Sequence, residues 1–132
     1  MLDTPVPPGE LLGPALTRHV LAQLGRAELG RGRPLAAVQA LEQARSLAPA
    51  DPEVYSDLGI ARAAAGQPGA AAEVLEECLA LHPEFAPAYF ILGRLLAGTG
   101  QMEGAKTYWR RGLQLMPAHP MATQLKPLLG GD

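Results

Sequence analysis

The chain has 132 residues, of which 48% are apolar and 18% are charged, a composition typical of one folded domain rather than a disordered segment. The formal net charge of -2 argues against binding nucleic acid or an anionic membrane through bulk charge. No apolar run approaches the roughly 18 residues that cross a bilayer, so we expect no membrane insertion.

Helix-forming residues dominate, with 23 alanines and 22 leucines, whereas β-branched residues are scarce. The composition therefore predicts an all-α protein. The only cysteine, Cys78, cannot form an intramolecular disulfide and is typical of a reducing compartment, so we expect a cytoplasmic location. Nine arginines against two lysines, with abundant alanine, glycine and proline, indicate a GC-rich bacterial coding sequence.

Residues 1–13 contain three prolines and two glycines, and we expect them to be irregular. The segment 14–119 that follows is organised by a repeat of 34 residues, which divides it into the units 18–51, 52–85 and 86–119 without an insertion. Seven columns carry the repeat: Leu24/Leu58/Leu92, Gly25/Gly59/Gly93, Gly32/Gly66/Gly100, Ala37/Ala71/Ala105, Ala44/Cys78/Gly112, Leu47/Leu81/Leu115 and Pro49/Pro83/Pro117.

Each unit is predicted to form two helices. In the second unit, Asp51 is the expected N-cap and Pro52 occupies the first turn, where its missing N–H costs nothing. Gly66 ends this helix at a positive φ, Pro68 begins the next helix, and Pro83 ends it. Units one and three repeat the pattern.

Glycine recurs inside the first helix of every unit, at Gly25, Gly59 and Gly93. A glycine in a helix costs about 1 kcal/mol relative to alanine. Because the cost recurs at one position, we expect the backbone of the partner helix to approach closely there.

Residues 120–132 are expected to form a short capping helix and a tail. Met121, Leu125 and Leu128 lie at helical spacing and would cover the apolar end of the last repeat. Their register departs from the 34-residue step, so this helix is either shifted or turns its apolar residues toward the concave side.

The three units resemble tetratricopeptide repeats over residues 18–119. This family implies a right-handed superhelical α-solenoid of three helix-turn-helix repeats that binds proteins. Its pattern has a large residue, Leu-Gly, Gly, Ala, a large residue, a small residue and Pro. Besides the recurring columns, the large-residue slots hold Leu21/Tyr55/Tyr89 and Leu41/Leu75/Trp109.

The resemblance also implies that the first helices line a concave groove that takes a partner peptide or helix. Phe90 is the expected anchor for an apolar side chain, with Arg94 beside it for an acidic group. The expected groove residues are His19, Ala22, Arg26, Glu53, Ser56, Asp57, Ile60, Phe90, Ile91 and Arg94.

Relatives that grip the free carboxylate of Hsp70 or Hsp90 tails use Lys, Asn, Asn, Lys and Arg in this groove. The matching positions here hold Ala22, Arg26, Asp57, Pro87 and Ile91. We therefore expect no such carboxylate clamp.

The sequence contains only weak candidate motifs for a catalytic, metal or cofactor site, and we expect none of the three. Cys78 and His82 lie four residues apart and could meet as a nucleophile and base, but Cys78 fills a small buried slot. Lys106, Arg110 and Arg111 form a basic strip that is expected to be a solvated face, with an acidic partner as the alternative.

The sequence thus predicts a non-enzymatic adaptor or co-chaperone-like scaffold whose partner is a protein or peptide. Two alternatives stay open: a self-assembling scaffold, and a chaperone of the secretion type.

Overall fold

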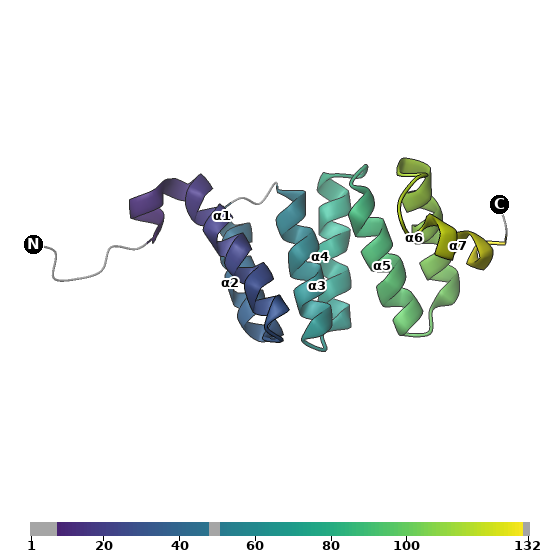
Figure 1. Cartoon of the computed structure of the whole chain (residues 1–132), viewed down its shortest axis with the longest axis horizontal. Helices are drawn as coiled ribbons and strands as arrows, with labels where there is room; N and C mark the ends of the chain where they lie inside the picture. Colours follow the sequence, from purple (N-terminus) through teal and green to yellow (C-terminus); the bar gives the residue numbers. More distant parts are fainter. Residues whose placement is uncertain (1–7, 48–50, 131–132) are drawn as a thin grey trace, which may run out of the picture.

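The computed structural model of the chain describes residues 8–47 and 51–130, with side chains from Gly13 onward. These residues form helices and no strand. The helices are α1 (Pro8–Gly30), α2 (Pro34–Leu47), α3 (Pro52–Ala64), α4 (Pro68–Leu81), α5 (Ala86–Gly98), α6 (Met102–Leu115) and α7 (Ala122–Leu128). They stand side by side along the long axis of the molecule (Figure 1).

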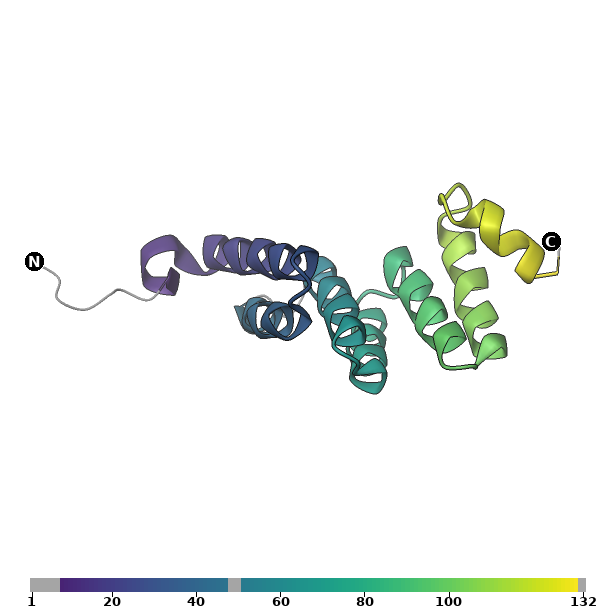
Figure 2. The ribbon, with the colours of Figure 1, turned by 60° about the horizontal axis from the view of Figure 1, so that its bottom comes forward.

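Helices α1/α2, α3/α4 and α5/α6 form three hairpins that follow one another along the chain. From a second direction the row stays extended and does not fold back on itself (Figure 2). The protein is therefore an all-α helical-repeat solenoid, as the sequence predicts.

The helix boundaries follow from local chemistry. The Asp51 carboxylate caps α3 by accepting a hydrogen bond of 3.0 Å from the Glu53 N–H, and Pro52 occupies the first turn. The turn within each hairpin contains a glycine at positive φ: 74° at Gly32, 77° at Gly66 and 82° at Gly100. These predictions of the cap and the turns are confirmed.

The recurring glycine inside the first helix makes room for a side chain. A Cβ on Gly25 would lie 2.5 Å from Cγ of Leu41, and a Cβ on Gly59 would lie 2.7 Å from Cγ of Leu75. On Gly93 it would collide with the indole of Trp109. The close approach is real, but the sequence-based assignment to a backbone is wrong, because the large residue of the second helix fills the space.

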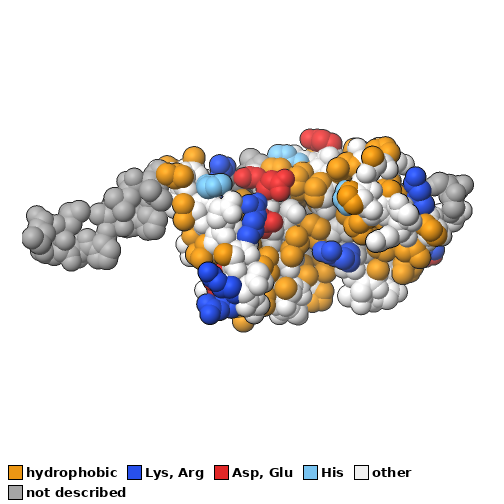
Figure 3. Space-filling view, viewed as in Figure 1, with side chains coloured by type: hydrophobic (Ala, Val, Ile, Leu, Met, Phe, Trp, Pro, Cys, Tyr) orange, Lys and Arg blue, Asp and Glu red, His pale blue; other side chains and the backbone are white. Residues whose placement is uncertain are grey.

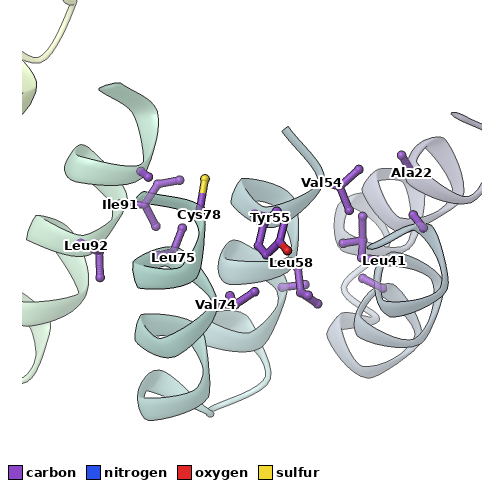
Figure 4. Packing of buried hydrophobic residues seen from close by; sticks show 14 residues of the cluster. Ala22, Leu41, Val54, Tyr55, Leu58, Val74, Leu75, Cys78, Ile91 and Leu92 are labelled. Carbon is purple, nitrogen blue, oxygen red and sulfur yellow. The ribbon is translucent and has the colours of Figure 1, made fainter. Parts of the chain in front are cut away.

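The core runs through the stack as a ladder of equivalent residues. Leu41 and Leu75 are fully buried, and so are Leu58 and Leu92 to within 1%. Figure 4 shows these leucines between successive helices, with Val54 and Tyr55 beside them. A second cluster continues the core to the C-terminal end. Each hairpin thus buries its apolar face against its neighbours in the row.

The N-terminal part differs from the expectation of an irregular segment, because α1 begins at Pro8. Helical backbone is interrupted at Gly13, which has φ 77° and ψ 160° and precedes Pro14. A proline disfavours helical backbone at the residue before it, and glycine adopts this conformation at little cost. Residues 1–7 of the expected irregular segment lie outside the described residues.

The last helix, α7, covers the C-terminal end of the stack with a shifted stripe. Ala122, Leu125 and Leu129 are buried, whereas Leu128 is 47% exposed. Leu125 and Leu129 join the cluster around Trp109. Of the two alternatives left by the sequence, the structure supports a shifted capping helix.

Candidate functional site

The first helices of the three hairpins meet along one face, where α3 contacts both α1 and α5. Figure 3 shows charged side chains of both signs toward α1 on this face and more hydrophobic ones over α3 and α5. Two hollows adjoin there, with volumes of about 260 and 230 Å³, and both are lined by Ile60, Ile91 and Arg94. Together these two adjoining hollows form the groove.

The two hollows differ in their remaining lining residues. The larger adds small and aliphatic residues of α3 and α5: Ala63, Ala64 and Leu95. The smaller reaches toward the C-terminal cap through Pro87, Phe90, His119 and Met121. The groove is therefore mainly apolar, with a single permanent charge, that of Arg94.

Arg94 is exposed and lies within 4 Å of no described carboxylate. Arg26, the other arginine predicted on this face, donates from Nε to the Asp57 carboxylate at 2.7 Å. A charge already matched by a neighbouring carboxylate has little attraction left for an anionic ligand. Arg94 is thus the cation of this face that remains open to a partner.

Burial shapes the electrostatics of the Arg26–Asp57 pair. The Asp57 side chain is only 15% exposed. Burial raises the pKa of Asp57 above its ordinary value, and the Arg26 guanidinium opposes that rise through its charge and its hydrogen bond. The pair therefore joins α1 to α3 while carrying a desolvation cost.

The structure divides the ten predicted groove residues into two sets. Ile60, Phe90, Ile91 and Arg94 come together around the two hollows. The other six lie on α1 and α3 and line neither hollow: His19, Ala22, Arg26, Glu53, Ser56 and Asp57.

Phe90 has a different role from the expected exposed anchor, because only 4% of its surface is exposed. A Cβ on Gly112 would lie 2.9 Å from Cζ of Phe90, so the ring depends on that glycine for its space. The other side of the ring stacks on His119, with centroids 4.0 Å apart and an interplanar angle of 21°. Phe90 is thus a core residue that also forms part of the wall of the groove.

Sequence reasoning assigned no role to His119. Its Nδ1 accepts a hydrogen bond of 3.1 Å from the Met121 N–H, which holds the ring in place against Phe90. Residue spacing gave no signal for this contact, because it depends on the loop after α6 returning over α5.

Cys78, the candidate nucleophile of the sequence, is not placed for that role. Cys78 is fully buried, its thiol lies 3.8 Å from the Pro52 carbonyl oxygen, and burial raises its pKa to about 11. A thiol in this state is protonated at neutral pH and is a poor nucleophile. No cluster of three metal-binding side chains occurs in the described part of the chain.

Within the described ranges, no helix is both long and apolar enough to span a membrane.

The stacked hairpins define the chain as a helical-repeat protein. Sequence profiles of the tetratricopeptide repeat family match residues 22–77 and 62–126, which together contain parts of all three hairpins. The chain belongs to the tetratricopeptide repeat family. None of the curated proteins compared with it matches significantly.

Solved structures show the same fold at low sequence identity. The type III secretion translocator chaperone SycD of Yersinia enterocolitica is 17% identical, with a TM-score of 0.82 over 98% of this chain and 100% of that one. SycD in complex with a peptide of the translocator YopD gives 19% identity and 0.78 over 86% and 89%. The second TPR domain of human RPAP3, bound to the HSP70 peptide SGPTIEEVD, gives 17% and 0.78 over 88% and 98%.

Proposed function

We propose that this protein is a non-enzymatic adaptor that binds a segment of a partner protein in the groove. The supporting observation is the pair of hollows that share Ile60, Ile91 and Arg94. Apolar walls beside one uncompensated guanidinium match a peptide with an aliphatic residue next to an acidic one. The fold is also the one in which SycD and RPAP3 hold the peptides named above.

The proposed ligand differs from a chaperone tail gripped by its terminal carboxylate. The positions that match the clamp are Ala22, Arg26, Asp57, Pro87 and Ile91, and Arg26 is already paired with Asp57. A peptide ending in Glu-Glu-Val-Asp is therefore expected to bind more weakly than micromolar. The buried, protonated Cys78 supports a module without catalytic activity, and a lone free cysteine supports a cytoplasmic location.

The test begins with selection from a random peptide library on the purified protein. The selected peptide is then titrated against the wild type, Arg94→Gln, Ile60→Gln and the control Arg26→Gln. We expect Arg94→Gln to weaken binding about tenfold, which corresponds to the loss of one charge-assisted hydrogen bond. Ile60→Gln should weaken it several-fold, and Arg26→Gln should change it less than threefold. Full affinity in both Arg94→Gln and Ile60→Gln would overturn the proposal.

A second candidate function, self-assembly, rests on the exposed face of α1. Val20 is 46% exposed and Leu24 45% exposed. Their equivalents one repeat later, Val54 and Leu58, are buried to within 1%. Among the described residues, no hairpin covers α1 in the way that the preceding hairpins cover α3 and α5.

A second copy of the chain is the occupant that fits this face. The C-terminal end of the stack is already covered by α7, which blocks head-to-tail stacking. The exposed stripe Leu16, Val20 and Leu24 carries no charge, so two copies can bring it together about a two-fold axis without repulsion.

Light scattering on the eluting protein tests this candidate. A dimer that Val20→Glu/Leu24→Glu converts to monomer would support it, with Leu81→Glu, at a 54% exposed residue of α4, as the control. A wild-type monomer at high concentration would contradict it.

A further inference from the structure

A third hollow lies outside the groove, between α6 and the C-terminal cap. Its volume is about 460 Å³, larger than either groove hollow. Its lining shares no residue with the groove and consists of Arg110, Leu113, Gln114, Pro117, Lys126 and Leu129. A concavity of this size is in the range of small-ligand and side-chain pockets.

Two basic side chains, Arg110 and Lys126, line this hollow. Both are exposed, and neither pairs with a carboxylate among the described residues. Residues 104–130 contain no Asp or Glu at all. In the first half of the described chain, by contrast, every arginine has a carboxylate partner: Arg18, Arg26, Arg31, Arg33, Arg45 and Arg62.

The floor of the same hollow is apolar. Leu129 is 9% exposed and packs in the cluster around Trp109, and Leu113 packs partly buried against that cluster. Pro117 adds a third apolar surface. A ligand that fills the hollow must therefore bring aliphatic groups to the floor and negative charge to Arg110 and Lys126.

From this combination we propose a second binding site on the protein, for an acidic and aliphatic peptide segment of a partner. One or two aliphatic side chains occupy the floor between α6 and α7. An adjacent carboxylate binds Arg110 and Lys126, with the Gln114 amide as a further donor. The site is separate from the groove, so one molecule can hold two segments at once and gain affinity through their linkage.

The test uses a fluorescein-labelled peptide, Gly-Ser-Gly-Glu-Leu-Leu, with a free carboxyl terminus, measured by fluorescence anisotropy on the full chain. The Arg110→Gln/Lys126→Gln variant should raise its Kd at least tenfold. Both positions are exposed, so helicity and Tm should stay at wild-type values. An amidated peptide with Gln in place of Glu should also bind at least tenfold more weakly than the first peptide.

Matched controls separate the site from general charge and from the groove. Arg111 neighbours Arg110 on α6, bonds to Gln114 at 3.3 Å and does not line the hollow. Arg111→Gln should change the Kd less than threefold. Arg94→Gln removes the binding that the groove contributes and should leave the Kd of the remaining site within threefold of its wild-type value. An Arg111→Gln effect equal to that of Arg110→Gln would mean that the peptide responds to overall positive charge and not to this hollow. Loss of binding with Arg94→Gln would mean that the peptide binds in the groove. Complete displacement by an equal concentration of decanoate would assign the hollow to anionic amphiphiles. Each of these three results would overturn the proposal.

Discussion

The two ends of the stack differ in how far their apolar faces are covered. At the C-terminal end, α7 places Leu125 and Leu129 over the last hairpin. At the N-terminal end, α1 leaves Val20 and Leu24 about half exposed. The basic side chains differ between the two halves as well. The arginines of the first half pair with carboxylates, whereas Arg94, Arg110 and Lys126 pair with no carboxylate among the described residues. The N-terminal end thus offers an apolar surface, and the C-terminal half offers positive charge beside apolar hollows.

The largest expected effect concerns the wall that joins the groove to the C-terminal cap. Phe90→Ala should lower the free energy of unfolding by about 3–5 kcal/mol, because the ring fills the space between Gly112 and His119. Urea denaturation followed by circular dichroism measures it. An unchanged unfolding free energy with reduced peptide binding would mean that Phe90 is an exposed anchor after all.

A pair of equivalent leucines tests the N-terminal side of the comparison. Leu58→Ala should cost about 3 kcal/mol, because Leu58 is fully buried. Leu24→Ala, at the same position one repeat earlier, should cost less than about 1 kcal/mol because its side chain is 45% exposed. Equal costs in urea denaturation would show that something covers α1 in solution, and a dependence on protein concentration would identify it as a second copy.

The C-terminal cap can be tested in the same manner. Leu125→Ala should cost about 2 kcal/mol, since Leu125 is 2% exposed and packs in the cluster with Trp109. Leu128→Ala, at a 47% exposed position of the same helix, is the control and should lie within about 0.5 kcal/mol of the wild type. If thermal unfolding ranked the two variants in reverse, α7 would pack through the stripe first expected from the sequence.

The smallest expected effect concerns Asp57, whose pKa is raised by burial despite Arg26. A carboxyl whose pKa is raised in the folded state binds its proton at a higher pH in the folded chain than in the unfolded chain. Its contribution to the unfolding free energy therefore increases as pH falls through the folded pKa toward the unfolded value, and decreases as pH rises. Asp57→Asn should remove this dependence and stay within about 1 kcal/mol of the wild type at pH 7, because the Arg26 side chain that loses its partner is 43% exposed and remains hydrated.

Urea denaturation of both proteins at pH 4 and pH 7 measures the difference. The wild type should gain stability relative to Asp57→Asn at the lower pH. A wild type that loses stability relative to Asp57→Asn at pH 4 would mean that the ion pair outweighs burial.

The sequence predicted the features that depend on local chemistry or on the repeat. The cap at Asp51 and the positive φ at Gly66 follow from residue type and position. The fold follows from the resemblance of the 34-residue units to tetratricopeptide repeats. The close approach at Gly59 was also predictable, although the filling group, Leu75, was not identified.

Contacts between side chains far apart in the sequence could not be predicted. Arg26 and Asp57 lie 31 residues apart, and nothing in their spacing shows that α1 brings them together. Phe90 was expected to bind a partner, but His119 stacks on its ring. This contact was not predictable, because His119 lies in a loop whose path depends on how α7 packs. For the same reason, periodicity alone could not distinguish Arg94, which is open, from Arg26, which is neutralised.

The most direct test of the groove is an NMR titration of isotope-labelled protein with the library-selected peptide. We expect the largest chemical-shift changes at Ile60, Ile91 and Arg94, and small changes at His19 and Glu53. Shift changes confined to α2, α4 and α6, with Ile60, Ile91 and Arg94 unmoved, would contradict it.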